Sequence, residues 1–362
     1  MRILAFLLFF QGLFACQQGP ETDRSPAVDT MLSSVAKAQK GAESSQSAVT
    51  DVVFKSADGG QTWQDVSAGL PKEVQVGCVL ASDHEVYLGT SEGLYRSGTD
   101  RARPIWQKEI FLWSGVSNLY PGKAGPYVCS FGNGFFQELP GTGVWMPMHN
   151  ALKDKTVQTV LEAPDGTFFV GCNSGIYKSA DGRKTWKKVY EGSMVTSLVA
   201  ADGVLVGGGA RGLLRSTDGG EHWFPVLTED GSIRNTAFVD GRLVCISNGG
   251  GPWKEVVADP EGKSSKMRAS SDGGTTWQRM DADLSLERFK DDMSERLAMT
   301  RGIYDIEQAG QYLFCSLDAG IFRSSDQGKT WTLVRAATGT KQFRLAVSGQ
   351  VVYAVMVSGD GC

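Results

Sequence analysis

The sequence predicts an all-β fold in which seven four-stranded blades form a ring, a β-propeller closed by pairing of its N- and C-terminal strands. Three observations support this. A short turn segment recurs along the chain, tryptophans follow it at nearly regular steps, and the two ends of the repeat region supply complementary strands. Internal repeats with a period of about 20–50 residues are typical of solenoids and propellers, so the repeat decides the fold class.

The recurring segment is a serine, an aspartate two residues later and a tryptophan five residues after the aspartate, with one or two glycines between the last two. Aspartate and glycine between apolar runs are typical of hairpin turns, because glycine accepts positive φ and the carboxylate bonds turn amides. The tryptophan then begins the outgoing strand and covers the hairpin, so the tryptophan series is expected to be buried. The predicted structural residues are Asp58, Asp181, Asp218, Asp272 and Asp326, with Trp63, Trp186, Trp223, Trp277 and Trp331.

Two decayed copies fill the gap between the first and second complete ones. Ser97 to Trp106 keeps the serine and the tryptophan with a nearby Asp100, and Gly141 to Trp145 keeps only Gly143 and the tryptophan. The tryptophans then stand at 63, 106, 145, 186, 223, 277 and 331. Four short strands with turn signals about ten residues apart fit between successive tryptophans, which is the pattern of one propeller blade.

The ends of the repeat region complete the count. Val52 to Ser56 has the pattern of a third strand without the first two, whereas 343–347 and 351–355 have the patterns of first and second strands without the rest. We expect the two ends to share one blade, which removes open sheet edges. Six internal blades and this shared blade make seven.

The N-terminal region precedes the predicted ring. Residues 1–15 carry one early positive charge and a short apolar run, which is typical of a secretory signal peptide. The run ends on Leu-Phe-Ala-Cys16, which resembles the lipidation site of bacterial lipoproteins, so Cys16 is the expected lipid attachment point. Residues 16–50 have the composition of a flexible tether, and the propeller is expected over 51–362. The sequence therefore predicts an exported lipoprotein anchored to a bacterial membrane, at the periplasmic side or the cell surface.

The turn segment resembles the Asp-box, or BNR repeat, of sialidases, sortilin-type receptors and photosystem II assembly factors. Over about 52–357 the whole chain is most similar in type to the photosystem II assembly factor propellers. That resemblance implies a ring without hydrolase motifs, in which the box residues support folding and lie away from the ligand face. The arginine patch of that family cannot be matched here position by position.

Composition and charge exclude several other functions. A net charge of −4 and a pI near 5.6 argue against a nucleic-acid partner. The three histidines, at 84, 149 and 222, have no metal-ligand spacing, and no cofactor motif is present, so neither a metal nor a cofactor is predicted. Cys129, Cys172, Cys245 and Cys315 fall in second strands and are expected to be small buried apolar residues, with disulfides not suggested by their spacing.

Two insertions belong to the fifth blade, at 249–266 and 281–300, and both fall on the face opposite the box turns. In the second, Leu286, Phe289, Met293 and Leu297 follow helical spacing, and the apolar stripe is expected to pack on the propeller, with partner binding as the alternative. Loops on a rigid scaffold often carry function. The candidate ligand residues near this face are Trp113, Arg234, Trp253, Arg301, Tyr304 and Arg344.

The predicted function is a non-catalytic binding or assembly scaffold that takes a protein or an anionic glycan on this face. The arginines suit a carboxylate or an acidic protein loop. They can equally pair with Asp305 and Glu307 or line a wet channel. The alternative is a sialidase-like glycoside hydrolase acting on an anionic glycan, since three arginines invite that comparison. The Arg-Ile-Pro motif of sialidases is absent and no Tyr–Glu nucleophile pair can be placed, so the catalytic residues are unknown.

Overall fold

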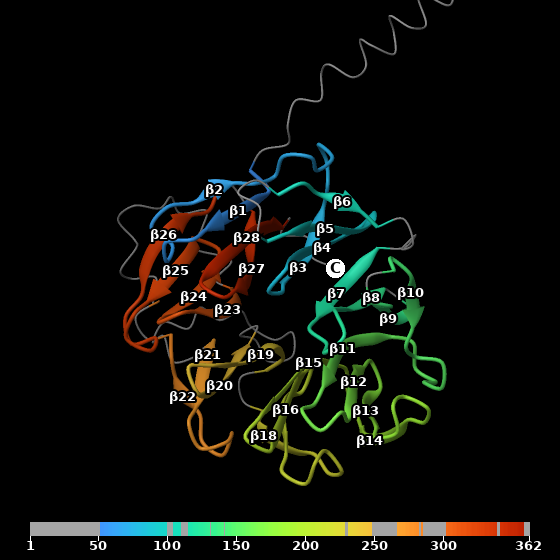
Figure 1. Cartoon of the computed structure of the whole chain (residues 1–362). Coiled ribbons are helices and arrows are strands. Elements are labelled where there is room, and N and C mark those ends of the chain that lie inside the picture. Colours follow the sequence, from blue (N-terminus) through green and yellow to red (C-terminus); the bar gives the residue numbers. More distant parts are fainter. Residues whose placement is uncertain are drawn as a thin grey trace, which may run out of the picture. The chain divides into compact units, whose positions relative to one another are not determined.

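The computed structural model describes residues 51–99, 104–109, 115–130, 132–140, 142–228, 231–247, 266–281, 284, 302–338 and 341–357. These residues form seven antiparallel sheets of four strands each, arranged around a ring (Figure 1). The predicted signal peptide, Cys16, the tether and nearly all of the two insertions lie outside the described residues. Within the described ranges, no helix is long and apolar enough to span a membrane.

Six blades follow one another along the chain, each with its first strand at the channel. Blade 1 contains β3 (Val76–Ala81), β4 (Glu85–Thr90), β5 (Gly93–Gly98) and β6 (Gln107–Lys108). Blade 2 contains β7 (Val116–Tyr120), β8 (Tyr127–Ser130), β9 (Gly134–Glu138) and β10 (Trp145–Pro147). Blade 3 contains β11 (Val157–Glu162), β12 (Phe168–Cys172), β13 (Gly175–Ser179) and β14 (Lys187–Glu191). Blade 4 contains β15 (Val195–Ala201), β16 (Val204–Gly209), β17 (Gly212–Ser216) and β18 (Phe224–Leu227). Blade 5 contains β19 (Ile233–Val239), β20 (Arg242–Ser247), β21 (Met267–Ser270) and β22 (Gln278–Arg279). Blade 6 contains β23 (Ile303–Ala309), β24 (Tyr312–Leu317), β25 (Gly320–Ser324) and β26 (Thr332–Ala336).

Blade 7 combines the two ends of the described chain, as the sequence predicts. Its order is β2 (Gln64–Asp65), β1 (Val53–Ser56), β28 (Val351–Val357) and β27 (Gln342–Ser348). Strand β1 pairs with β28 over four residues, and the Met356 amide donates to the Val52 carbonyl at 2.7 Å. The innermost strands contact one another all the way round, and β27 contacts β3, so the ring is closed.

The apolar core lies between neighbouring blades rather than within any one of them. One cluster joins Val244 and Ile246 of blade 5 to Ile306 and Phe322 of blade 6. Equivalent clusters join the other pairs, because both faces of each middle strand are covered by the blades beside it. The four second-strand cysteines are buried in these clusters, as predicted.

The five complete turn segments share one hydrogen-bond pattern. In blade 4 the Ser216 hydroxyl donates to the Asp218 carboxylate at 2.8 Å and accepts from the Gly220 amide at 3.0 Å. The other Asp218 oxygen contacts His222 Nδ1 at 2.7 Å, where the remaining four turns have a threonine hydroxyl. These bonds stabilise the carboxylate form, and in the first turn the Thr62 bonds lower the pKa of Asp58 to about 2.

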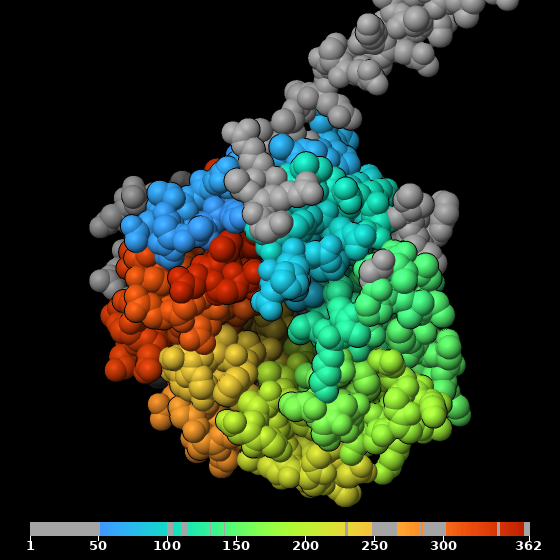
Figure 2. Space-filling model, in the orientation of Figure 1, coloured from blue at the N-terminus to red at the C-terminus, as the bar shows by residue number. Residues whose placement is uncertain are grey.

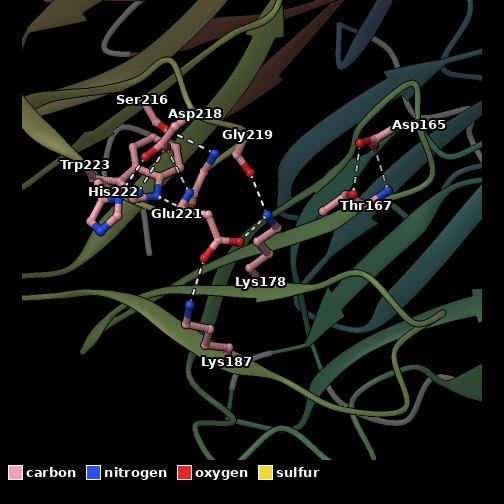
Figure 3. A network of polar contacts seen from close by, with 11 residues as sticks. Asp165, Thr167, Lys178, Lys187, Ser216, Asp218, Gly219, Glu221, His222 and Trp223 are labelled. Carbon is pink, nitrogen blue, oxygen red and sulfur yellow. Dashed lines mark hydrogen bonds and ion pairs between the residues drawn. The ribbon is translucent and has the colours of Figure 1, made fainter.

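In blades 3, 4 and 6 a basic residue just before the turn segment binds the turn of the next blade. Figure 3 shows Lys178 of blade 3 donating to the Gly219 carbonyl at 2.8 Å and to Glu221 at 2.7 Å. Arg215 and Arg323 bond the first glycine carbonyl of the following turn in the same way, at 2.6 and 2.7 Å. The recurring Lys or Arg therefore links neighbouring blades, a role that the sequence did not predict.

The repeated tryptophans reach back toward the preceding blade. Trp223 is 7% exposed and meets Phe169 of blade 3 edge to face, and Trp331 donates to the Met280 carbonyl of blade 5. Trp106 and Trp145 are also buried. The expectation that the whole series is buried needs a correction for Trp63, Trp186 and Trp277, which are only partly covered. The outermost strand has no further sheet beyond it, so the cover of each indole depends on local neighbours.

We expect Trp223→Ala to lower the free energy of unfolding by about 3–5 kcal/mol, as truncation of a buried aromatic side chain does. Trp186→Ala should lower it by clearly less, because the Trp186 side chain is half-buried and its buried indole N–H has no hydrogen-bond partner. Chemical denaturation of both variants checks the difference. Equal losses would mean that burial does not set the contribution of these side chains.

Candidate functional site

The first strand of six blades has a β-bulge at its second residue. In β19 the register shifts between Ile233 and Asn235, and in β23 between Ile303 and Asp305, which leaves Arg234 and Tyr304 as the extra residues. A bulge turns the side chain of the extra residue away from the regular alternation. Blade 7 has continuous pairing, and Arg344 is the third residue of its first strand, without a bulge. The extra residues of the bulges in blades 1 to 4 are neutral: Gly77, Ser117, Gln158 and Thr196.

The structure brings Arg234, Tyr304 and Arg344 together. The Arg234 guanidinium lies over the Tyr304 ring, 5.0 Å from its centroid, a favourable cation–π arrangement. Arg344 Nη1 donates to the Tyr304 carbonyl at 3.0 Å. Burial and the nearby charge of Arg344 lower the pKa of Arg234, so the two guanidinium groups are close enough to repel each other. An anion placed between them would relieve that repulsion.

Tyr304 is fixed from two further sides. Its hydroxyl donates a short hydrogen bond to Asp318, which stands in the turn between β24 and β25, and accepts from Gln342 Nε2 at 2.6 Å. Asp318 also accepts from the Gly302 amide at 2.9 Å. These bonds hold the tyrosine in one orientation, so the two arginines face a rigid surface.

Below this cluster, β23 carries two acidic side chains inside the ring. Asp305 is buried and accepts from Asn235 Nδ2 and from the Leu345 amide, both at 3.1 Å. Burial raises the pKa of Asp305, although Arg344 acts in the opposite direction. Burial and the neighbouring Asp305 raise the pKa of Glu307 to about 8. The protonated form of Glu307 therefore prevails at neutral pH.

Of the six candidate residues, three lie together and three fall outside the described residues. Trp113, Trp253 and Arg301 belong to the second group. Sequence reasoning missed Gln342 and Asp318 as partners of Tyr304. Asp318 follows a second strand directly and so lies on the face opposite the box turns, which was the available signal. Gln342 gave no such signal in the sequence, because its contact with Tyr304 depends on how blades 6 and 7 pack together.

The cluster does not suit nucleophilic catalysis by tyrosine. Tyr304 and Asp318 form the nearest counterpart to the Tyr–Glu pair that sialidases use. Burial and Asp318 raise the pKa of Tyr304, however, which disfavours the phenolate, and the side chain is 5% exposed. Among the described residues, no group of three or more His, Cys, Asp and Glu side chains is placed to hold a metal ion. The arrangement can bind and orient an anionic group.

The ring is hollowed at its centre (Figure 2), and basic and aromatic side chains gather at one mouth of that channel. This combination defines a repeat-built β-propeller with a charged and aromatic cluster at one mouth of its channel. The family model described as "Photosynthesis system II assembly factor YCF48" matches residues 22–246, and the chain belongs to that family. No curated protein matches the chain in sequence.

Solved structures of similar fold include YCF48 bound to a D1 peptide, at 16% identity and a TM-score of 0.55, covering 80% of this chain and 94% of that one. YCF48 from Cyanidioschyzon merolae matches at 16% identity and a TM-score of 0.53, covering 79% and 97%. The GH74 xyloglucanase from Xanthomonas campestris matches at 15% identity and a TM-score of 0.51, covering 75% and 46%. At these identities the likeness shows the fold alone.

We expect Glu307→Gln to flatten the pH dependence of stability. The folded-state pKa of about 8 lies above the unfolded value, so the native state binds more protons between those two values. The wild-type protein should therefore lose stability as the pH rises from about 5 to 8, by roughly 1.4 kcal/mol for each unit of pKa difference at most. Urea denaturation at pH 5.5 and pH 8.5 measures this. If the wild type and Glu307→Gln lost the same free energy of unfolding between pH 5.5 and pH 8.5, Glu307 would be ionised in the folded state.

Proposed function

We propose that this protein is a non-catalytic binding or assembly scaffold that holds an acidic segment of a partner protein at the channel mouth of blades 5 to 7. The observation that carries the proposal is the convergence of Arg234 and Arg344 on Tyr304, where burial and the like charge of Arg344 lower the pKa of Arg234. Carboxylates suit this arrangement, because a guanidinium offers paired donors in a plane.

Two observations favour a peptide over a free anion as the ligand. They are the number of polar groups beside the arginines and the peptide bound in the structure of a relative. Gln342 and Asp318, which hold the Tyr304 hydroxyl, add an amide and a carboxylate beside the arginines, which suits a chain with several groups to recognise. YCF48, whose family this chain shares, has been solved with a D1 peptide bound. An anionic glycan is the other occupant that the charge permits, and competition experiments separate the two.

The same proposal includes attachment to a bacterial membrane through lipid on Cys16. Its support is the sequence alone, where an apolar run ends directly on Leu-Phe-Ala-Cys16 and a polar stretch of small residues follows. A tether of that composition would let the ring move relative to the membrane surface while raising its effective concentration near membrane partners.

Replacing Arg234 or Arg344 by glutamine should weaken capture of the partner from solubilised membranes by about tenfold each, because each variant removes one charge-assisted contact. Added salt should weaken capture by the wild type in the same direction. Lys187→Gln, an exposed change in an outermost strand, is the control and should capture normally. Melting temperatures of all variants show whether the ring stays intact. Normal capture by both arginine variants would place the binding surface elsewhere.

Cys16→Ser should move the protein from the membrane fraction to the soluble fraction, because the thiol that carries the lipid is lost. Mass spectrometry of the wild-type N-terminal peptide should find an acylated cysteine. Unchanged fractionation together with an unmodified Cys16 would contradict the anchor.

A screen of fluorogenic glycosides tests the hydrolase alternative directly. The wild-type protein is expected to release no more fluorophore than the buffer. Turnover that disappears in Tyr304→Phe would overturn the non-catalytic assignment and would identify the Tyr304–Asp318 pair as the reacting group.

A further inference from the structure

The outer ends of blades 3 and 4 are joined by ion pairs that recur nowhere at the junction of blades 2 and 3. Figure 3 shows Glu221 of the blade 4 turn, which accepts from Lys178 and from Lys187 of blade 3, each at 2.7 Å. Lys178 precedes the serine of its turn segment, and Lys187 pairs with it on the outermost strand. Glu221 is the third residue after the aspartate of the next turn segment.

At the junction of blades 2 and 3 the same three positions carry different residues. Gln137 of β9 pairs with Met146 of β10, and these two residues are the counterparts of the two lysines. Lys184, the third residue after Asp181, replaces the glutamate. Its amide donates to the Asp181 carboxylate at 3.1 Å, as the Glu221 amide does to the aspartate of its own turn. Met146 and Lys184 cannot form an ion pair, so that link between the blades is missing.

The blade 2 side of this junction exposes three apolar side chains that form one patch. Leu139 is 43%, Val144 46% and Met146 42% exposed. Trp145 is buried against blade 1, so Val144 and Met146, the residues on either side of it in the chain, point toward blade 3. The Leu139 amide donates to the Val144 carbonyl at 2.8 Å, which places the two side chains across from each other on that same side.

The blade 3 side of the junction contributes Arg183, which reaches across to blade 2. Arg183 occupies the turn position of Gly220, where an added Cβ would lie 2.2 Å from Phe169 of the preceding blade. A whole side chain fits at the corresponding place in blade 3, so blades 2 and 3 leave room here that blades 3 and 4 do not. The Arg183 guanidinium lies 4.4 Å from the centroid of the Phe168 ring, and Nη1 donates to the Tyr127 hydroxyl of blade 2 at 3.3 Å.

The positive charge at this junction has no acid set against it. Within the described ranges neither Arg183 nor the exposed Lys184 forms an ion pair. Asp181 accepts from the serine and threonine hydroxyls of its own turn at 2.9 and 2.6 Å. Glu162 accepts from the Tyr127 hydroxyl at 2.9 Å, and its side chain is 10% exposed. A carboxylate supplied by a ligand would therefore meet both cations without competing with an acid of the chain.

An apolar patch beside two cations suits an extended segment in which acidic and apolar residues alternate. Residues i and i+2 of an extended chain face the same side, so a carboxylate can reach Lys184 while the next apolar side chain lies on Val144 and Met146. The pairing of an acidic ligand with Arg183 and Lys184 is charge-complementary. A flat bilayer suits the patch less well, because the patch faces the neighbouring blade.

We propose that an outer notch, formed by Leu139, Val144, Met146, Arg183 and Lys184, binds an acidic and apolar segment of a partner protein. The segment would supply the link between blades 2 and 3 that the ion pairs of Glu221 supply between blades 3 and 4. The notch lies at the outer strands, away from the channel mouth of blades 5 to 7, and does not depend on the function proposed for that mouth.

The experiment titrates the full-length Cys16→Ser chain, labelled with carbon-13 at its methionine methyl groups, with a peptide of three Leu-Thr-Asp-Thr repeats. The NMR signal of Met146, assigned by its loss in Met146→Leu, reports on the notch alone. We expect a saturable shift of this signal that weakens with salt, whereas the buried Met267 and Met280 of blade 5 keep their signals. Peptides of Leu-Thr-Lys-Thr and of Ser-Thr-Asp-Thr repeats should each bind at least about tenfold more weakly.

Substitutions on both sides of the notch test its two components. Lys184→Glu should weaken the peptide by at least about tenfold, through reversal of a charge, and Val144→Ser should weaken it through loss of apolar contact while the reporter stays in place. Lys187→Gln is the matched control and should bind normally, because the acid that Lys187 meets belongs to the chain itself. Arg234→Gln should also bind normally, so failure here and failure at the channel mouth remain distinguishable. Because Lys184 and Val144 are exposed, melting temperatures should stay close to that of the wild type.

Three results would overturn the proposal. The first is the absence of a saturable Met146 shift in the wild type. The second is equal affinity of the wild type and Lys184→Glu, or of the wild type and Lys184→Gln if the charge reversal does not fold. The third is a larger Met146 shift with vesicles of phosphatidylglycerol and phosphatidylcholine than with the peptide, which would assign the notch to a membrane surface.

Discussion

Closure of the ring by β1 on β28 is the constraint on which the channel and its contents depend. Strand β27 carries Arg344 and lies innermost in a blade whose outer half comes from the opposite end of the chain. Without β1 and β2, β28 would present an open edge, and only the contacts of β27 and β28 with blade 1 would hold the ring shut. Arg234 and Tyr304 lie on the innermost strands of blades 5 and 6, so the three side chains come from three successive blades.

The box turns stabilise single hairpins, whereas the basic residues before them join neighbouring blades. Each serine and aspartate pair organises its own hairpin, through bonds that span four residues or fewer. Lys178, Arg215 and Arg323 then tie the hairpins of blades 4, 5 and 7 to the preceding blade. Apolar contacts between blades have little directionality, so these bonds, with those between innermost strands such as Asn235 to Asp305, add directional links.

The fold could be predicted from the sequence because its signals are local and repeated. The turn residues and the strand alternation lie within single hairpins, and the tryptophans recur once in each blade. The incomplete sets of strands at the two ends add up to one blade, which predicts closure of the ring. The candidate site was predictable only in part. Arg234, Tyr304 and Arg344 could be placed on innermost strands from the repeat, but the bulges that turn Arg234 and Tyr304, and the contact of Gln342 with Tyr304, depend on packing between blades. The partial exposure of Trp186 has the same origin.

The loss of the turn pattern in blades 1 and 2 has a physical reading. Glu138 occupies the position that serine holds in the complete turns, and its carboxylate accepts from the Gly143 amide at 2.9 Å. It thus replaces the local bond and at the same time receives Arg96, the basic residue of the preceding blade, at 3.1 Å. The hairpin of blade 2 is held by an acid in place of a neutral hydroxyl. Trp145 reinforces this arrangement by donating to Glu109 at 3.2 Å. The fold is preserved there with extra negative charge, and Ser97 is left without its original role. In a repeat protein whose other five turns keep the ring in shape, two blades can change in this way, so the decayed copies are where a new surface can arise without loss of the scaffold.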